Sequence, residues 1–503
     1  MASGLLALAA GVAGAQEAAG TGTPRGLVFK PRVSVSETYT DNNLLSSTQR
    51  DATLISTLSP GISIVANGGS VTGTLDYSLS GIAYTKSEQV DRLQQTLNAH
   101  GRADFVPQVF FVDVLANISQ QNGSAVGTLS ADPNLGYQNR VEIQTLTIAP
   151  TLRSHIGSLA TLQIQGTASG TNTVDSMIGD SRQLAGSARL DGLNPGRLRP
   201  WAMLTATQLH YKSSSVNSGD VQAMVGLRYQ PDVDFFMTGD VGREHSNYVG
   251  GTGQYENTSL YGASISWTPT PRTIVSLDWQ NHSYGDSHSI RLEHRMSRSV
   301  WRYSDSQSIT QSTQLGSANL GSNYDLLFLE YASVEPDPVK RDLLVRNLLQ
   351  NLGLNPNSQI VIGFLSNVPI LSRNRQAAFA LEGVRTTLTV SFSQNISRQV
   401  GVNAQTAGDL SKFGQINQHG FNLSVAHRLT PMSSVNAAFS VTRSAGLDPV
   451  TLAGSNTLRT FNLGWNGRLG PTSVVTLGAR HAQEEGSNPY RENAVVATFL
   501  QNF

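Results

Sequence analysis

The chain has 503 residues, with 35 basic and 35 acidic side chains, no cysteine and only 14% charged residues. The neutral balance argues against a nucleic-acid partner, because phosphate binding requires a basic excess, and the absence of cysteine excludes thiol catalysis and disulfide bonds. The charged fraction is far below the roughly 25% of ordinary soluble domains, and Ser, Thr, Asn and Gln replace the missing charges.

The N-terminus predicts export. An apolar run from Leu5 to Val12 precedes Ala13-Gly14-Ala15, which is typical of a signal peptide with a small-residue cleavage site. We therefore assign residues 1–15 to a signal peptide and residues 16–30 to a periplasmic segment. Because no Lys or Arg precedes the apolar run, we expect this signal peptide to be truncated at its start. After Ala15 no stretch reaches the ~20 apolar residues of a membrane helix.

Residues 31–503 alternate between apolar and polar side chains over most of their length. Successive side chains of a strand point to opposite sides, so a period of two indicates a sheet with two different environments. A membrane β-barrel needs this pattern, with lipid outside and a polar lumen inside. The clearest segments are Val71–Ser80, Ala160–Ser169, Tyr261–Trp267, Val275–Gln280 and Val435–Thr442.

The connections between these segments are of two alternating kinds. The short kind, at 67–69, 231–232, 270–272, 430–431 and 470–471, contains Gly, Pro or Asp, which favour tight turns. The longer, polar kind occurs at 41–52, 121–137, 171–180, 212–219, 248–257 and 444–456. Short turns on one rim and long loops on the other are typical of bacterial outer-membrane barrels. We therefore predict an all-β fold, a single antiparallel transmembrane barrel of about 20–22 strands whose N- and C-terminal strands pair.

One insert, at residues 316–370, interrupts the strand pattern. Asp337 is suited to cap a helix and Pro338 to its first turn. Leu344, Leu348 and Leu352 then lie on one apolar stripe, which predicts an amphipathic helix of about four turns over residues 337–353. Such a stripe requires a partner surface, and we interpret the insert as a plug or cap of the barrel. The alternative is a rim subdomain without a gating role.

Six charged residues are predicted to line the lumen. Arg291, Glu293 and Arg295 alternate with less polar residues in one predicted strand. A charge on the lipid face costs roughly 2–4 kcal/mol near the midplane, which favours the lumen for these three. The other predicted lumen residues are Asp76, Asp240 and Asp278. A polar wall of mixed sign suits a hydroxyl-rich solute such as a polysaccharide, and the alternative is that these residues only satisfy one another.

The C-terminal segment ends on Phe503, and Val495, Ala497 and Phe499 lie on the same face of its predicted strand. A terminal phenylalanine after such a strand resembles the signal read by the machinery that inserts outer-membrane barrels. We therefore predict that Phe499 and Phe503 form an assembly signal.

The sequence does not indicate a catalytic, cofactor or metal site. The ten histidines are scattered, without the spacing of an HExxH or similar metal motif, and no GxSxG nucleophile motif occurs. His282 and His288 flank a predicted polar loop, where a solvated histidine is more common than a metal ligand. A site at the barrel rim stays open, but we predict that the protein is not an enzyme.

Several short motifs, taken in order, resemble those of a known family. They are Glu37–Asn42, Trp301–Asp305, Glu335–Arg341, His427–Pro431, Leu477–His481 and Pro489–Asn493. The set resembles the outer-membrane proteins associated with PEP-CTERM/exosortase systems, which are encoded beside exopolysaccharide genes in Gram-negative bacteria. The resemblance covers nearly the whole mature chain, and it implies a barrel with an export-related role and without catalytic residues.

Three functions are compatible with these patterns. The first is an outer-membrane barrel associated with exopolysaccharide export or PEP-CTERM/exosortase surface systems. The second is a diffusion porin for small hydrophilic solutes, and the third is a non-conducting scaffold for surface proteins. The expected location is the outer membrane of a Gram-negative bacterium. The expected partners are the outer-membrane lipid bilayer, the barrel-assembly machinery and, for the first function, exopolysaccharide and envelope export proteins.

Overall fold

The computed structural model describes most of the chain after the predicted signal peptide. The described residues are 26–85, 91–132, 134–135, 137–174, 180–193, 196–212, 217–248, 254–310, 324, 327–328, 341, 345, 363–366, 368–400, 408–447 and 454–503. The predicted signal peptide, residues 1–15, therefore lies outside the described residues, together with residues 16–25.

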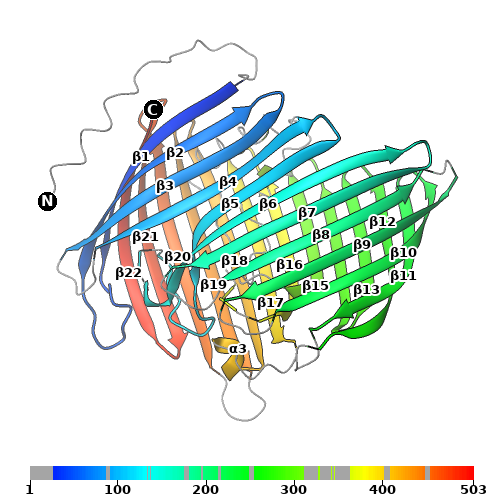
Figure 1. The fold of residues 1–503 in the computed structure, drawn as a ribbon. Coiled ribbons are helices and arrows are strands. Elements are labelled where there is room, and N and C mark those ends of the chain that lie inside the picture. Colours follow the sequence, from blue (N-terminus) through cyan, green and yellow to red (C-terminus); the bar gives the residue numbers. More distant parts are fainter. Residues whose placement is uncertain are drawn as a thin grey trace.

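These residues form one large antiparallel barrel (Figure 1). Its first half consists of β1 (Gly26–Thr40), β2 (Thr53–Asn67), β3 (Val71–Thr85), β4 (Arg92–Val106), β5 (Phe110–Asn122), β6 (Arg140–Ile156), β7 (Ala160–Thr173), β8 (Ser181–Gly192), β9 (Leu198–Tyr211), β10 (Ser218–Asp232) and β11 (Phe235–Ser246). Its second half consists of β12 (Glu256–Thr270), β13 (Thr273–His282), β14 (Gly285–Arg295), β15 (Ser299–Thr310), β16 (Ile370–Glu382), β17 (Thr386–Gln399), β18 (Gln415–Thr430), β19 (Ser433–Leu447), β20 (Ser455–Arg468), β21 (Ser473–Gly486) and β22 (Tyr490–Asn502). Two short helices, η1 (Tyr137–Asn139) and α3 (Asp409–Lys412), lie in connections between strands.

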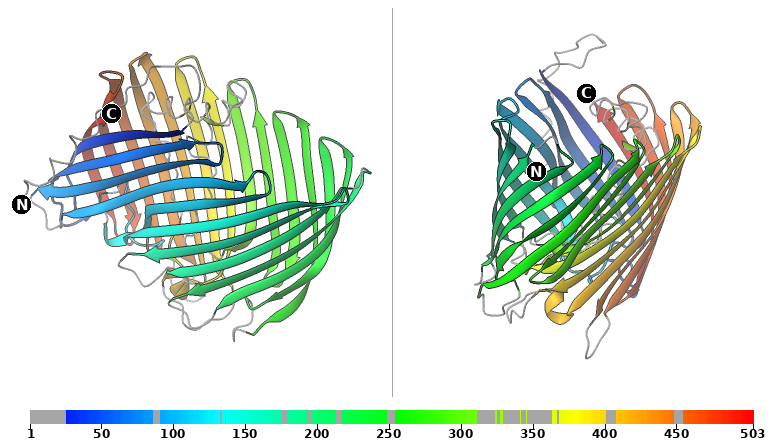
Figure 2. Two further views of the ribbon diagram at one scale, coloured as in Figure 1. Left: turned by 45° about the horizontal axis from the view of Figure 1, so that its top comes forward. Right: turned by 90° about the vertical axis from the view of Figure 1, so that its right-hand side faces the viewer.

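The barrel closes because β1 pairs with β22 as well as with β2. Closure leaves no unpaired sheet edge, which a membrane-spanning sheet cannot tolerate. Each strand otherwise pairs with its neighbours in sequence, as the right-hand view of Figure 2 illustrates from the side. The predicted single antiparallel barrel, with its terminal strands paired, is confirmed, and its 22 strands reach the upper end of the predicted range.

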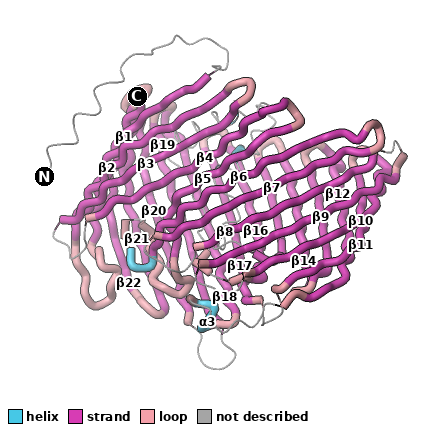
Figure 3. The backbone as a smooth tube through the Cα atoms, viewed as in Figure 1, coloured by secondary structure: helices cyan, strands magenta, loops and turns pink. Residues whose placement is uncertain are grey.

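The two rims differ as the turn chemistry predicts. One rim, which we call the turn rim, carries short connections such as 68–70, 157–159 and 431–432, and the two ends of the described chain. The opposite loop rim carries the longer connections and α3, with short ones at 283–284 and 487–489. In Figures 1 and 3 the C-terminus lies at the upper, turn rim and α3 at the lower, loop rim. By the layout of bacterial barrels, the turn rim faces the periplasm and the loop rim the cell exterior.

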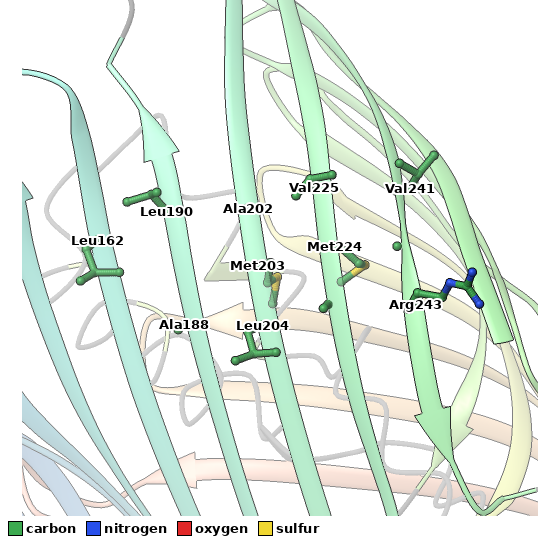
Figure 4. Close-up of a pocket in the computed structure, with 12 residues that line it drawn as sticks. Leu162, Ala188, Leu190, Ala202, Met203, Leu204, Met224, Val225, Val241 and Arg243 are labelled. Atoms are coloured by element: carbon green, nitrogen blue, oxygen red, sulfur yellow. The ribbon is translucent and has the colours of Figure 1, made fainter. Parts of the chain in front are cut away.

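The outer face of the wall carries large exposed apolar side chains, as a lipid-facing surface requires. Examples are Leu58, Leu204, Val225, Trp267 and Leu463. Figure 4 shows part of this wall between β7 and β11, where apolar residues such as Leu162, Leu190 and Val241 border a shallow groove of about 550 Å³. The alternate side chains of each strand face the lumen and are mostly polar or small.

The barrel begins earlier than the predicted boundary at residue 31. Strand β1 starts at Gly26, and Val28 and Phe29 pair with Val65 and Ile64 of β2. Because β2 continues to Asn67, it provides hydrogen-bond partners for residues 26–30, which therefore belong to the wall and not to a periplasmic segment.

The predicted plug helix falls mostly outside the part of the chain that the structure describes. Asp337, Pro338, Leu344, Leu348 and Leu352 lie outside the described residues. Arg341 and Val345, from the same segment, are helical, and Val345 is fully buried. The guanidinium of Arg341 lies 4.5 Å from the ring centre of Phe328. The plug role of residues 337–353 stays a prediction.

The terminal residue is anchored to the first strand. The backbone N–H of Phe503 donates to the Pro31 carbonyl (2.9 Å), and its side chain is exposed on the same outer face as Phe499. We expect Phe503→Ala to lower the outer-membrane level several-fold at constant transcript, because the exposed aromatic ring is what the assembly machinery would contact. The measurement is the amount of heat-modifiable barrel in outer-membrane fractions. Leu500→Ala, a change on the inner face of the same strand, is the control, and equal levels of the two variants would contradict the signal.

Candidate functional site

We call the connection between β5 and β6, residues 123–139, the strap, and its described residues (123–132, 134–135 and 137–139) lie inside the barrel. Its residues contact α3 and the inner faces of β2, β3 and β20 to β22. Around the ring, β1 to β4 and β19 to β22 lie between β5 and β18, next to which α3 is placed. The strap therefore lies over the inner faces of these strands near the loop rim, and its contact with α3 joins two parts of the ring that are separated by eight strands.

The first residues of the strap, directly after β5, are held by Asp409 of α3. One carboxylate accepts hydrogen bonds from the Ser124 hydroxyl (2.9 and 2.8 Å to its two oxygens) and from the Ala125 N–H (2.5 Å). Asp409 and Ala125 are both buried. Ala125 belongs to a cluster of apolar residues that also contains Phe364, Val368, Ile370, Leu410 and Ile416. Hydrogen bonds to a carboxylate acceptor are stronger than those between neutral groups, so this contact fixes the start of the strap to α3.

The middle of the strap is held through its backbone. The Asn456 amide of β20 donates to the carbonyls of Val126 (2.7 Å) and Gly127 (2.9 Å). The Tyr490 hydroxyl of β22 donates to the Leu129 carbonyl (2.7 Å), while the Leu129 N–H donates to Glu484 of β21 (3.2 Å). These side chains supply partners for backbone groups that are buried away from regular structure, as such groups require.

A buried ion cluster fixes the next part of the strap. The Arg480 guanidinium lies 2.8 Å from the Asp132 carboxylate of the strap and 2.7 Å from that of Glu492. The Thr40 hydroxyl of β1 also donates to Glu492 (3.0 Å). All four side chains are buried or nearly so. Removing one partner of such a cluster leaves uncompensated buried charge, which is strongly destabilising.

Apolar residues complete the attachment near the β6 end. Leu129 and Leu135 of the strap are buried in one cluster with Leu45 of the β1–β2 connection and with residues of the wall, namely Ile55, Ile82, Leu458, Ala482 and Tyr490. The Tyr84 hydroxyl donates to the Asn134 carbonyl (2.6 Å). Apolar residues at lumen positions of β2 and β3 thus have a partner surface, and the strap is packed as a small core within the barrel.

Three of the motifs quoted above converge on this strap. Thr40 and Asn42 come from the first motif, Arg480 from the fifth, and Tyr490 and Glu492 from the last. The Asn42 amide donates to the Arg491 carbonyl (2.9 Å), which links the first and last motifs directly. The motifs are far apart in sequence, but closure of the barrel through β1 and β22 brings them together.

The sequence placed residues 121–137 among the polar surface loops, and this placement differs from the structure. The segment contains Ala125, Val126, Leu129 and Leu135 at intervals, and three of these four are fully or almost fully buried. Regular apolar residues in a long connection are the signal that could have revealed it, because an exposed loop has no reason to keep them.

The six predicted lumen residues all lie on the inner face, by strand register, but they do not form one site. Asp76 makes a bidentate contact with Arg32 (2.7 and 2.8 Å). Far along the ring, Glu293 contacts Arg291 (3.0 Å) and Arg302 (3.4 Å). For Asp76, Arg291 and Glu293 the structure therefore agrees with the alternative in which the charged residues pair with other charged residues of the wall. Arg295 lies near the turn rim and donates to the Pro271 carbonyl (2.8 Å).

Asp240 and Asp278 lie in a polar hollow of about 630 Å³ along β8 to β15. The Gln280 amide donates to Asp240 (3.3 Å). In the same hollow the Arg189 guanidinium lies 4.9 Å from the ring centre of Trp201. Gly226 permits this arrangement, because a Cβ there would lie 2.5 Å from the Trp201 ring. Cation, aromatic ring and carboxylates thus share one stretch of the lumen wall.

His282 and His288 occupy opposite faces of the wall. His282 is buried inside, 3.4 Å from the Glu244 carboxylate, whereas His288 faces outward and lies 3.3 Å from Asp305. The expectation that both are solvated loop residues is wrong for His282, which ends β13. Nearby, burial and then the Asp220 and Glu244 carboxylates raise the pKa of the Tyr248 hydroxyl, which donates to Asp220 (2.5 Å).

Within the described part of the chain, no group of three or more His, Asp or Glu side chains has the arrangement of a metal site. Likewise, no described helix is long and apolar enough to cross a membrane.

Comparisons with known proteins support the fold. No protein-family model and no curated protein sequence matches the chain. Among solved structures, the FrpB iron transporter of Neisseria meningitidis (F5-1 variant, apoprotein form) is similar at 9% identity and a TM-score of 0.50, covering 94% of this chain and 81% of that one. OpdK of Pseudomonas aeruginosa, solved with vanillate, is similar at 10% identity and a TM-score of 0.34, covering 94% and 99%. At these identities the likeness concerns the fold alone.

The closed barrel, its apolar outer face and its likeness to an outer-membrane barrel agree on location. The chain is a protein of the outer membrane of a Gram-negative bacterium.

Proposed function

We propose that the protein is an outer-membrane channel for small hydrophilic solutes, in which the strap narrows the lumen near the cell exterior. The observation that carries this proposal is the contact between the first residues of the strap and Asp409 of α3, which joins the loop-rim ends of β5 and β6 to the connection between β17 and β18. A barrel of this size would otherwise enclose a large opening, and barrels of 22 strands typically hold a plug in the lumen. The proposal is transport without catalysis.

The lumen wall supports solute passage. Ser and Thr side chains alternate along its strands, and paired charges such as Arg32–Asp76 and Arg102–Asp113 keep it polar without a strong net field. The hollow around Arg189, Trp201 and Asp240 offers hydrogen-bonding groups beside an aromatic face. Such a wall favours neutral, hydroxyl-rich solutes over ions of one sign.

A role in exopolysaccharide export or in an exosortase system rests on the motifs alone and stays a prediction. Passage of a polymer chain would require the strap to leave its place, because its contacts extend between distant parts of the wall. A small solute needs only the space beside it. This difference favours the diffusion channel.

The test is conductance of the full chain in planar lipid bilayers, with liposome swelling in sugars of graded size. We expect discrete channels and a size cut-off in the range of small sugars. Complete absence of conductance from correctly folded, heat-modifiable barrel would contradict the channel and favour the scaffold alternative. Blocking by a long polysaccharide, with passage of its short fragments, would separate polymer export from simple diffusion.

We expect Asp409→Ala to loosen the first residues of the strap. The change removes an ionised acceptor of hydrogen bonds, each worth roughly 1.5–3 kcal/mol, so the attached state should lose at least about tenfold in relative population. The measurement is open-channel noise and the frequency of larger conductance substates. Asp180→Ala is the matched control, because Asp180 accepts from the backbone and hydroxyl of Thr173 without touching the strap. Equal noise in both variants would mean that Asp409 does not hold the strap.

A further inference from the structure

The outer face of the wall carries a row of arginines that the channel does not use. They are Arg373 and Arg375 of β16, Arg398 of β17, Arg443 of β19 and Arg459 of β20. We call these five residues the arginine belt. All five lie in the half of their strands that is nearer the loop rim.

Strand register places the belt outside the barrel. Register partners face the same side of a sheet, and Arg459 pairs with Val441, which pairs in turn with Phe421. The same face carries Phe379, Phe392, Phe421, Phe439 and Phe461, one on each strand from β16 to β20. The belt therefore borders a row of aromatic rings, with the rings on the side toward the turn rim.

The belt has an excess of positive charge. Between β15 and β21 the outer face carries two carboxylates, Asp305 and Glu485, against five arginines. Asp305 is shared by Arg373 (2.7 Å) and Arg375 (3.3 Å), and Glu485 contacts Arg459 (2.6 Å). Arg398 and Arg443 have no acidic partner among the described residues. Three of the five positive charges are thus uncompensated by the part of the chain that the structure describes.

The position of the belt matters because lipid penalises charge by depth. Arginine on a barrel exterior is several times more costly at the bilayer midplane than near the interface. The turn-rim half of the same face, from β15 to β21, carries no Lys or Arg. The belt therefore lies at the headgroup level of one leaflet, which is the outer leaflet by the assignment of the rims.

We propose that the arginine belt binds the phosphate-bearing headgroup of an outer-leaflet lipid, whose acyl chains lie along the phenylalanine row. Planar guanidinium groups bind phosphate oxygens in pairs, and Arg398 and Arg443 are available to do so. The apolar row beside the belt favours a lipid over a free anion as the ligand, because a free anion has no acyl chains that could pack against the phenylalanine rings.

The test uses the folded full chain in detergent and the bis-phosphorylated glucosamine lipid, lipid A, as probe. Native mass spectrometry measures retention of this lipid and of its dephosphorylated form. We expect retention of the phosphorylated lipid to be at least about tenfold stronger and to weaken as salt rises, because exposed charge pairs are screened.

The test variant is the double change Arg398→Gln and Arg443→Gln, which should reduce retention about tenfold. The matched control is Arg182→Gln with Arg243→Gln, which removes two outer-face arginines of β8 and β11 that stand alone near the same rim. It should change retention less than twofold. Heat modifiability of both variants confirms that they fold.

Three outcomes would overturn the proposal. Equal retention of the dephosphorylated lipid would show that the phosphate groups are not recognised. Equal loss in the control variant would show that the arginine belt is not the binding site. Displacement of the lipid by millimolar inorganic phosphate would indicate a general anion site instead of a lipid site.

Discussion

Replacing the strap by a two-residue turn should raise single-channel conductance several-fold. Residues 123–139 can be replaced by Asn-Gly, because Asn122 and Arg140 are register partners at the ends of β5 and β6 and this dipeptide favours two-residue hairpins. The physical reason for the larger current is that the strap occupies the part of the lumen next to β2, β3 and β20 to β22. The measurement is conductance in planar bilayers, with the swelling assay for sugars as a second readout.

The control is the same Asn-Gly replacement of residues 448–453, between β19 and β20. If this variant gains as much conductance as the strap variant, the increase comes from a shorter rim and not from a cleared lumen. Unchanged conductance after removal of the strap would mean that the current follows a path that the strap does not touch.

A cysteine pair keeps the test informative if the strapless barrel folds poorly. The chain has no cysteine, so Ser124→Cys with Asp409→Cys introduces the only two thiols. These side chains are in contact in the native chain. We expect low conductance and low noise when the pair is oxidised, and both to rise on reduction.

The barrel could be predicted from sequence because its causes are local. Alternation at positions such as Val435 to Thr442 fixes two different faces, and the turn chemistry at Thr430-Pro431 fixes where a strand reverses. Each such signal lies within about ten residues. The strand number and the pairing of the two terminal strands then follow from closure.

The strap could not be predicted because its partners are distant in sequence. Asp132 and Arg480 lie 348 positions apart, yet they form one ion pair within the lumen. The sequence around each of these two residues indicates only an ordinary charged residue of a loop or of the lumen wall. The motifs around Thr40, Arg480 and Glu492 resemble one family as a set, but only the ring closure shows that they surround one segment.

The charged residues on the outer face are exceptions to the rule that charged strand residues face the lumen. Lipid cost alone would assign every strand charge to the lumen, and strand register puts Arg291 and Glu293 on the inner face. It does not describe Arg373, Arg375 and Asp305, which face outward near the loop rim. Depth decides the cost, and depth along a strand is set by register.

The second large effect concerns stability. We expect Arg480→Met to lower the free energy of unfolding by about 3–5 kcal/mol, as for other broken buried ion pairs. The change leaves the carboxylates of Asp132 and Glu492 buried without their cation. The measurement is guanidinium unfolding in phospholipid vesicles, followed by tryptophan fluorescence.

The matched control is Arg102→Met. Arg102 also makes two hydrogen bonds with one carboxylate of the lumen wall, that of Asp113 (2.8 and 2.9 Å), but its side chain is 43% exposed, against 9% for Arg480. Solvent-exposed pairs contribute about 0–1 kcal/mol, so Arg102→Met should have a small effect. Adding Glu492→Gln and Asp132→Asn to Arg480→Met should recover part of the loss, because both uncompensated charges are then gone. Equal destabilisation by Arg102→Met and Arg480→Met would mean that the cluster around the strap is hydrated, and the strap would then be a loosely held segment instead of a fixed constriction.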